Sequence, residues 1–240
     1  MNLNYDSPAS IKEFLEAEGL AMSKRFGQNF LVDKNARERL YKAIGISAGS
    51  KVWEIGPGIG SITSLLLDHR HPLKVFEIDH GFARVLRSLY GSNPLFALEE
   101  GDFLKTWEKA LAAEGTGSRP DVIFGNLPYN AALAIIAELL EHPWTPPDIV
   151  FTVQKEAARR IAAKPGTKDY SAFSVLCSSV CRPEILYDIG ASAFSPQPRV
   201  VSSVVRLTPR PDPVAASDRL GFSRFVRAGF SSRRKTLRNN

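Results

Sequence analysis

Short apolar segments alternate with helical patterns along the middle of the chain, and this alternation limits the folds open to it. The apolar segments are Val52–Ile55, Leu73–Ile78, Leu95–Leu98, Val122–Phe124 and Ile149–Val153, and the helical patterns are Ser61–Leu67, Phe82–Tyr90, Ala131–Glu141 and Glu156–Ala163. Apolar strands joined by helices form a parallel sheet that is covered on both faces. A last Val- and Ile-rich pair, 184–189 and 201–207, is expected to close the sheet as a hairpin-like edge. The sequence therefore predicts an α/β fold with a mostly parallel seven-stranded sheet.

Two helices are expected before this sheet. Ser7 and Pro8 form a start signal for a short capped helix that ends near Gly19, and a second helical pattern covers residues 34–44. A loop with the sequence Ser-Lys-Arg-Phe-Gly-Gln-Asn-Phe-Leu, residues 23–31, connects them. We therefore treat residues 1–45 as an N-terminal helical and loop segment of the main domain.

The positive charge of the chain is concentrated at its C-terminal end. The net charge is +6, from 31 basic and 25 acidic residues. Seven of the basic residues and none of the acidic ones lie in 219–240, so the preceding part carries 24 basic and 25 acidic residues. A proline-rich linker at 209–213 separates the two parts. We therefore divide the chain into a domain at 1–209 and a basic helical segment at 210–240. Such a segment is either a solvated helix face or a contact surface for a polyanion, whose binding releases counterions.

Several classes of protein are disfavoured. The longest run of small and apolar residues, Ala131 to Ala137, is far shorter than the ~20 residues that a bilayer requires. The N-terminus lacks the pattern of a signal peptide. Cys177 and Cys181 are four residues apart on an expected helix and are interpreted as reduced, buried residues of a cytoplasmic protein. The four histidines have no zinc spacing with these cysteines, so no metal is expected.

A glycine-rich loop follows the first predicted strand. Its sequence is Glu-Ile-Gly-Pro-Gly-Ile-Gly, residues 54–60. Glycines let the backbone approach a ligand at the carboxyl end of a strand, where open α/β sheets bind their ligands. The dinucleotide fingerprint requires a further glycine at the position of Ser61, so the pattern G-x-G-x-G at Gly56, Gly58 and Gly60 is closer to that of methyltransferases.

Acidic residues follow the next two strands. Glu77 ends the second strand, where a carboxylate can accept both hydroxyls of a ribose, and Asp79 is a competing candidate. Asp102 follows the third strand, where it can accept a hydrogen bond from an adenine amine. Any one of these acids could instead cap a loop. Together with the glycine loop, these acids give a signal after each of three successive strands, which favours a nucleoside-containing cofactor.

The most specific motif follows the fourth strand and has the sequence Asn126-Leu127-Pro128-Tyr129. It is a variant of the [D/N]-P-P-[Y/F] signature of enzymes that methylate planar amines. The N6 amine of adenine is a weak nucleophile because its lone pair is delocalised into the ring. The side-chain carbonyl of Asn126 and the main-chain carbonyl of Leu127 could hold both N–H groups and aim the lone pair at a methyl carbon. Pro128 stiffens the turn, and Tyr129 offers a face for the base.

With these motifs in place, the chain from Lys24 to Asn240 resembles the KsgA family of ribosomal RNA adenine N6,N6-dimethyltransferases, in its bacterial branch. The resemblance includes 28–31 (QNFL), 54–58 (EIGPG), 126–130 (NLPYN), 154–156 (QKE), 164–170 (KPGTKDY), 194–200 (FSPQPRV) and 230–240 (FSSRRKTLRNN). It implies a Rossmann-like methyltransferase fold and the cofactor S-adenosylmethionine.

The resemblance also implies roles for single residues. Asn29 and Leu31 touch the cofactor, Gly56 and Gly58 line its methionine part, Glu77 binds the ribose, Asp102 binds the adenine, and Asn126 lies at the methyl end. Phe194 covers the target base on the face opposite Tyr129, unless it is a plain core anchor, and the two aromatic rings then enclose a flipped nucleotide. The RNA contacts are Arg233, Arg234, Lys235 and Arg238 in the basic segment.

The implied substrate is a pair of adjacent adenosines in a hairpin near the 3′ end of small-subunit (16S) rRNA, each methylated twice within a pre-30S particle. We expect a cytoplasmic monomer. Two departures from the family stand out. Ala131 and Ala132 replace a hydroxyl-bearing pair after the Asn-Leu-Pro-Tyr-Asn stretch, and the family's helical C-terminal domain continues beyond the position of Asn240. The RNA-docking segment 210–240 is therefore expected to be cut short.

Three other functions stay open at this stage. A large-subunit rRNA adenine N6-methyltransferase of the macrolide-resistance type would share the fold and the catalytic loop, but the 194–200 and 233–237 stretches fit the small-subunit branch better. A non-catalytic RNA-binding ribosome assembly factor would not need the groups of Asn126 to Tyr129. An NAD-dependent oxidoreductase is disfavoured by Ser61 and by the catalytic loop.

Overall fold

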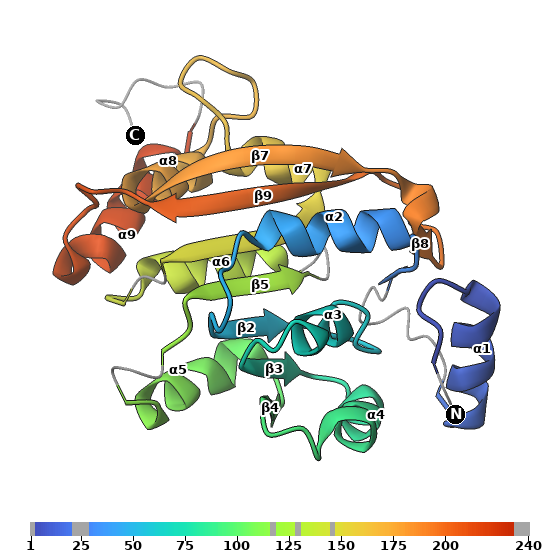
Figure 1. Cartoon of the computed structure of the whole chain (residues 1–240). Coiled ribbons are helices and arrows are strands. Elements are labelled where there is room, and N and C mark those ends of the chain that lie inside the picture. The colour runs from blue at the N-terminus through green and yellow to red at the C-terminus, as the bar shows by residue number, and fades with distance from the viewer. Residues whose placement is uncertain (1–2, 21–28, 116–118, 128–130, 145–146, 233–240) are drawn as a thin grey trace.

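A seven-stranded sheet forms the centre of the computed structural model, which describes residues 3–20, 29–115, 119–127, 131–144 and 147–232 (Figure 1). The strand order is β4-β3-β2-β5-β6-β9-β7. The first five of these strands are parallel, and β9 runs antiparallel between β6 and β7. The strands are β2 (Val52–Ile55), β3 (Leu73–Glu77), β4 (Phe96–Glu100), β5 (Val122–Asn126), β6 (Asp148–Gln154), β7 (Cys181–Ile189) and β9 (Ser202–Pro209). The predicted fold class, with its antiparallel closing edge, is confirmed.

Helices cover both faces of the sheet, as Figure 1 shows. The helices are α1 (Pro8–Ala17), α2 (Lys34–Ile44), α3 (Thr63–Asp68), α4 (His80–Tyr90), α5 (Phe103–Ala113), α6 (Ala132–Glu141), α7 (Lys155–Ile161), α8 (Ala172–Val180) and α9 (Arg219–Gly229). One buried cluster joins α2, α3 and α4 to Val52, Val75 and Val122, and another joins α5 to α8 to Trp53 and Ile123. Neighbouring strand residues thus point to opposite faces, and each face buries its own apolar layer.

The expected helix over 34–44 is confirmed at both ends, and its limits have local causes. The side chain of Asp33 accepts a hydrogen bond from the N–H of Ala36 at 2.7 Å and so caps the first turn. Gly45 ends the helix with a φ of 71°, in the left-handed region that favours glycine. One expectation is wrong, because only Cys177 lies on a helix. Cys181 begins β7, although both cysteines are buried and free.

A second, two-stranded sheet was not predicted. β1 (Phe30–Leu31) pairs antiparallel with β8 (Phe194–Ser195), so that Leu31 faces Phe194 across the ladder. The N–H groups of Val32 and Asp33 extend the contact, since both donate to the carbonyl of Ala193 at 2.8 and 3.2 Å. The ribbon brings the loop before α2 beside a segment more than 160 residues away in the chain.

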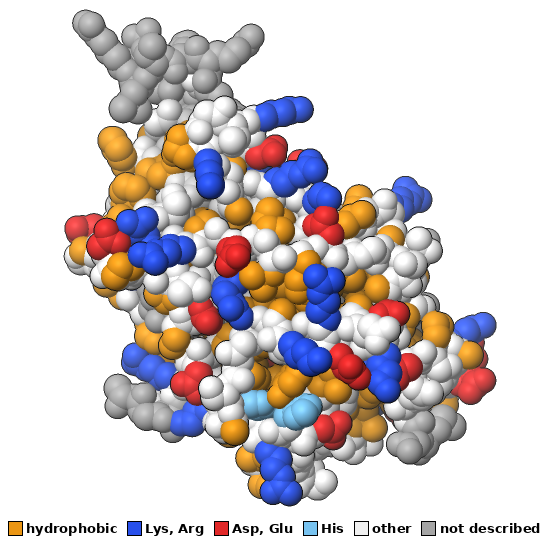
Figure 2. Space-filling view, turned by 45° about the horizontal axis from the view of Figure 1, so that its top comes forward, with side chains coloured by type: hydrophobic (Ala, Val, Ile, Leu, Met, Phe, Trp, Pro, Cys, Tyr) orange, Lys and Arg blue, Asp and Glu red, His pale blue; other side chains and the backbone are white. Residues whose placement is uncertain are grey.

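The first and last helices lie at opposite ends of the molecule (Figure 1). α1 lies beyond the carboxyl ends of β2 and β3, and α9 packs against α6 and α8. Lys and Arg side chains on the face in Figure 2 are interspersed with Asp and Glu. Within the described residues, no helix is both long and apolar enough to span a bilayer.

Candidate active site

The loop after β2 forms a turn that only glycine accommodates well. Gly56 and Gly58 have φ values of 67° and 59°, which residues with a side chain rarely adopt. A Cβ atom at Gly58 would lie 3.0 Å from Cε1 of Phe30, so space is limited as well. The loop lies at the carboxyl end of β2, which is where open α/β sheets bind ligands. The two glycines predicted to line the cofactor are therefore brought to the expected edge of the sheet.

Glu77 closes this loop from the neighbouring strand. One carboxylate oxygen accepts the N–H of Gly58 at 3.0 Å, and the other accepts the N–H of Asp79 at 2.9 Å. The side chain is only 4% exposed, and burial raises its pKa to about 7, although these hydrogen bonds favour the charged form. Asp79, the competing candidate, instead caps α4 by accepting the N–H groups of Gly81 and Phe82 at 2.8 and 3.2 Å. The geometry thus favours Glu77 as the ribose-binding acid.

A second buried acid, Glu54, lies on β2 beneath the glycine loop. Its carboxylate accepts a 2.6 Å hydrogen bond from the hydroxyl of Thr63, the first residue of α3. Its pKa is raised to about 8, mainly by burial, with the nearby Glu77 carboxylate acting in the same direction and the Thr63 hydrogen bond opposing it. Sequence reasoning placed Glu54 in a motif but gave it no role. Its position in the strand before the loop was the available signal, whereas its burial could not be deduced.

Two further residues lie after the neighbouring strands. Asp102 caps α5, because its Oδ1 accepts the N–H of Leu104 at 3.1 Å. The capping role is therefore present, and the predicted contact with adenine would use the remaining acceptor capacity of the carboxylate. Ile78 directly follows Glu77 and is 43% exposed, although it is apolar. Sequence reasoning counted it in the strand, but the strand ends at Glu77 and leaves Ile78 as an apolar surface beside the acid.

Asn126 is the last residue of β5, next to the glycine loop. β5 pairs with β2 so that Gly125 is opposite Ile55, and a Cβ atom at Gly125 would lie 2.9 Å from the Ile55 carbonyl oxygen. The Nδ2 of Asn126 donates to the carbonyl of Asn29 at 3.3 Å. This contact fixes the amide of Asn126, whose Oδ1 is the acceptor atom. Leu127 is 2% exposed and its N–H donates to Thr152 at 3.2 Å. Pro128 and Tyr129 lie outside the described residues.

The β1·β8 ribbon brings three other predicted residues to the same place. Asn29 precedes β1 and accepts from Asn126, and Leu31 lies opposite Phe194. Phe194 is only 4% exposed and belongs to the buried cluster that contains Leu31 and Ile189. In this arrangement Phe194 anchors the ribbon. Stacking on a target base stays a prediction, and it requires more of the ring to become accessible.

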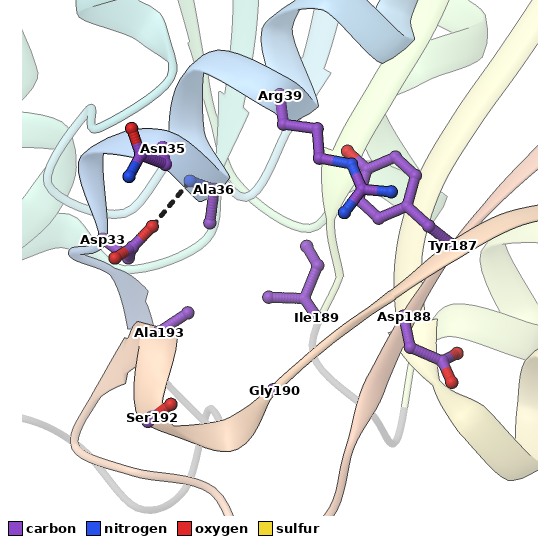
Figure 3. A pocket seen from close by; sticks show the side chains of 10 residues that line it. All are labelled: Asp33, Asn35, Ala36, Arg39, Tyr187, Asp188, Ile189, Gly190, Ser192 and Ala193. Atoms are coloured by element: carbon purple, nitrogen blue, oxygen red, sulfur yellow. Dashed lines mark hydrogen bonds between the residues drawn. The ribbon is translucent and has the colours of Figure 1, made fainter.

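A hollow lies beside the turn that carries Phe194, as Figure 3 shows. It is bounded by α2 on one side and by the end of β7 and the following turn on the other. The guanidinium of Arg39 stacks 3.7 Å from the centroid of the Tyr187 ring, and the side chain of Asp33 caps α2 at its rim. None of the predicted site residues lines this hollow. Its lining residues are Asp33, Asn35, Ala36, Arg39, Tyr187, Asp188, Ile189, Gly190, Ser192 and Ala193.

The start of the basic segment is fixed to the catalytic domain. Arg219 donates to the carbonyl of His142 at 2.8 Å, and Ser223 donates to the carboxylate of Glu141 at 2.6 Å. The other side of α9 leaves Phe225 67% exposed and Leu220 47% exposed. The predicted RNA contacts, Arg233, Arg234, Lys235 and Arg238, lie outside the described residues.

These residues fit S-adenosylmethionine. Gly56 and Gly58 have φ values that favour glycine, and a Cβ atom at Gly58 would press on Phe30, so the loop backbone stays bare on this side. The Glu77 carboxylate contacts the same loop through the N–H of Gly58 and retains acceptor capacity for a hydroxyl. Ile78 supplies an apolar surface at the same edge. Within the described part of the chain, no group of His, Cys, Asp or Glu side chains is arranged to hold a metal ion.

Comparison with known proteins identifies the family. Residues 19–240 match the family described as ribosomal RNA adenine dimethylase. The "Ribosomal RNA small subunit methyltransferase A" of Treponema denticola is 47% identical over 239 residues, which cover 99% of this chain and 80% of the relative. The protein of that name from Pseudomonas aeruginosa is 42% identical over 217 residues, which cover 90% of this chain and 80% of that relative.

Solved structures give the same assignment. A dimethyladenosine transferase from Plasmodium falciparum superposes with a TM-score of 0.70 and 26% identity, over 86% of this chain and 72% of that one. The 23S rRNA methyltransferase ErmE superposes with a TM-score of 0.68 and 26% identity, over 87% of this chain and 82% of that one. The chain therefore belongs to the ribosomal RNA adenine dimethylase family of S-adenosylmethionine-dependent methyltransferases.

Proposed function

We propose that the chain methylates the N6 amines of two adjacent adenosines near the 3′ end of small-subunit (16S) rRNA, twice each. The observation that carries the proposal is the convergence of Asn126, Asn29 and the glycine loop at the carboxyl ends of β2 and β5. Within the family, relatives 38–47% identical to this chain carry a small-subunit name, which favours that branch. The structural likeness to a 23S rRNA enzyme is compatible with the alternative, at 26% identity.

The residues around Asn126 can orient the amine for transfer. When bound, S-adenosylmethionine supplies an electrophilic methyl group. The hydrogen bond from Nδ2 to Asn29 fixes the side-chain amide, so Oδ1 can accept one N–H of the base and the Leu127 carbonyl the other. Both contacts draw the nitrogen lone pair out of the ring. With the amine held in this way, N6 would accept the methyl group, and the proton that it then carries in excess would leave to solvent. A strong base is unnecessary, because the methylated nitrogen is acidic until that proton leaves.

The remaining contacts of the proposal are assigned as follows. Glu77 accepts the ribose hydroxyls of the cofactor, Asp102 its adenine amine, and Gly56, Gly58, Asn29 and Leu31 line the rest. Tyr129 and Phe194 cover the two faces of the flipped adenine. The basic residues from Arg233 to Arg238 contact rRNA phosphates, and residues 210–240 form a basic RNA-docking segment that follows the catalytic domain 1–209. The enzyme acts as a cytoplasmic monomer on a pre-30S particle.

The test is methyl transfer to immature ribosomal particles. The protein is incubated with radiolabelled S-adenosylmethionine and either small or large subunits that lack the modification, and labelled nucleotides are mapped by mass spectrometry. We expect N6,N6-dimethyladenosine at two neighbouring positions of the small subunit. Label on a large-subunit adenine would support the macrolide-resistance type instead. Binding of small subunits without label, in a protein that binds the cofactor, would support an assembly factor without catalysis.

A further inference from the structure

The N-terminal residues contact the cofactor loop. Residues 3–20, here called the N-terminal segment, pack against the glycine loop. The hydroxyl of Tyr5 donates to the carbonyl oxygen of Ile59 at 2.9 Å and lies 2.7 Å from the hydroxyl of Tyr90. Because Ile59 lies between Gly58 and Gly60, this bond holds the middle of the glycine loop.

A second set of contacts connects the N-terminal segment to the end of the same loop. Asp6 forms an ion pair with Arg37 of α2, and Arg37 donates to the carbonyl oxygen of Ser61 at 3.1 Å. Arg37 is 6% exposed, so its contacts are shielded from water, and such hydrogen bonds from charged groups are the stronger ones. The carbonyls of Ile59 and Ser61 are thus held by neighbouring residues of the N-terminal segment, one directly and the other through Arg37.

The other end of the segment is tied to the start of α4, the helix that follows Glu77. Arg84 donates to the carbonyl oxygen of Glu18 at 2.8 Å. A Cβ atom at Gly81 would lie 2.4 Å from Cδ2 of Leu20, so the chains are in close contact there. The N-terminal segment therefore spans from the glycine loop to α4, the helix that follows the ribose-binding acid.

Between these ends, α1 buries an apolar face against the glycine loop and α4. Ile11 and Leu15 are 2% and 3% exposed and belong to a cluster with Ile59 of the glycine loop and Phe82 of α4. Phe30 joins the same cluster and packs edge-on against Phe82, with 5.6 Å between ring centroids. Phe30 also limits the space at Gly58. Two segments predicted to line the cofactor, the 28–31 stretch and the glycine loop, thus share one small core with α1 and α4.

We propose that the N-terminal segment is a positioning element for S-adenosylmethionine, and that Tyr5 is its main positioning residue. The proposal rests on the cofactor site assigned above. A loop with several left-handed glycines loses much conformational freedom on becoming ordered. Contacts that order it before the cofactor arrives reduce this entropic penalty and so tighten binding. The segment then acts on cofactor affinity and leaves the methyl-transfer step itself unchanged.

The test compares two Tyr→Phe variants of the full chain by isothermal titration with S-adenosylmethionine and with S-adenosylhomocysteine. Tyr5→Phe keeps the ring and removes the hydroxyl on the Ile59 carbonyl. We expect both ligands to bind it about threefold to tenfold more weakly, as for the loss of one partly buried hydrogen bond. Tyr41→Phe is the matched control, since its hydroxyl bonds His71 at 3.1 Å, away from the glycine loop. It should bind both ligands as the unmodified protein does. In turnover assays Tyr5→Phe should raise the KM for S-adenosylmethionine while kcat is unchanged.

Asp6→Asn gives a second, milder probe, because it removes the charge facing Arg37 and keeps the shape of the side chain. It should weaken cofactor binding in the same direction as Tyr5→Phe.

Three results would overturn the proposal. The first is unchanged affinity in Tyr5→Phe. The second is a loss of affinity shared with Tyr41→Phe that follows a lower melting temperature, which would make the segment a stabilising element only. The third is a fall in kcat at constant KM. Glu77→Ala separates this inference from the cofactor site on which it rests. Weak binding in Glu77→Ala with normal binding in Tyr5→Phe would reject the positioning role alone, whereas normal binding in Glu77→Ala would reject the assigned site as well.

Discussion

Acidic side chains at the two ends of the central sheet differ in their burial and in their hydrogen-bond and ion-pair partners. At the amino end, Glu114 forms a 2.6 Å ion pair with Lys74 of β3, and Asp121 accepts the N–H of Lys51 at 2.8 Å. At the carboxyl end, Glu54 and Glu77 are almost completely buried, and their hydrogen bonds come from a hydroxyl and from backbone N–H groups. Burial raises the pKa of both acids at this end.

This difference separates stability from function within one sheet. An acid whose charge is already balanced by a lysine gains less from a ligand than a buried acid without a counter-charge. Buried acids with raised pKa values hold acceptor capacity that a ligand with hydroxyl or amine groups can use, and such groups cluster at functional sites. Catalytic and cofactor roles are therefore expected at the carboxyl end only, and variants at the two ends should separate turnover and binding from folding.

The largest expected effect is on turnover in Asn126→Ala. Removal of the side chain eliminates both the acceptor for N6–H and the donor to Asn29. We expect kcat for methylation of small subunits to fall about 100-fold or more, because orientation of a weak nucleophile is lost. Cofactor affinity should change far less. Asn126→Asp is the informative comparison, since it keeps an acceptor but cannot donate to Asn29, and it should retain more activity than the alanine variant. Equal activity of Asn126→Ala and the unmodified enzyme would remove Asn126 from the mechanism.

A smaller effect, on cofactor binding, is expected from Glu77→Ala. The loss of a charged acceptor for the ribose should weaken binding of S-adenosylmethionine at least tenfold, measured by titration calorimetry. Asp79→Ala provides the contrast, because Asp79 caps α4. It should lower the free energy of unfolding by about 1 kcal/mol, as for a lost helix cap, with a smaller change in affinity. The opposite result would show that Asp79 is the ribose acid.

The buried acids at the carboxyl end should also make the stability of the protein depend on pH. Burial raises the pKa of Glu77 to about 7 and of Glu54 to about 8, from an ordinary value of 4.5. At pH values between the ordinary pKa and the raised ones, the folded protein holds protons that the unfolded chain releases. The free energy of unfolding of the cofactor-free protein should therefore fall as the pH rises from about 5 to about 8, by on the order of 1 kcal/mol or more.

Urea unfolding at several pH values measures this slope. Glu54→Gln mimics the protonated acid and keeps an acceptor for Thr63. Its free energy of unfolding should therefore depend less on pH than that of the unmodified protein, and the comparison should favour the variant more at about pH 8 than at about pH 5. Stability that rises with pH over this window in the unmodified protein would mean that these carboxyls are charged in the folded state.

The strands of the sheet could be predicted because apolar runs between helices have few other solutions. Their ends could not always be predicted. β4 continues through Glu99 and Glu100, and β7 begins at Cys181 ahead of Arg182, because edge strands tolerate polar residues that hydropathy assigns to loops. The β1·β8 ribbon was missed for another reason. Each strand has two residues, and their partners are far apart in sequence, so no periodic pattern marks them.

The candidate site could be predicted in part for a related reason. Glycines and acids after successive strands leave a local signal, since parallel strands end at one edge of the sheet. The burial of Glu54 and the bond from Tyr5 to Ile59 depend on contacts between distant segments. Neither residue could be distinguished in sequence from an ordinary strand acid or an ordinary tyrosine. The covering role of Phe194 stays a prediction, because its ring is buried here.

The smallest effect on the cofactor is expected at the amino end, from Glu114→Gln. Glu114 and Lys74 are 14% and 18% exposed at their side chains, and Lys74 also lies 5.7 Å from the centroid of the Trp53 ring. Loss of the negative charge leaves Lys74 partly buried without its counter-charge, so the free energy of unfolding should fall by about 1–3 kcal/mol, less than for a fully buried pair. Affinity for S-adenosylmethionine should stay within about twofold, since the ion pair lies at the far end of β3 from Glu77. Unfolding by urea and calorimetric titration on the same sample test both parts. A tenfold loss of affinity in Glu114→Gln, with the fold intact, would show that the two ends of the sheet are coupled and that charge at the amino end helps to set the cofactor site.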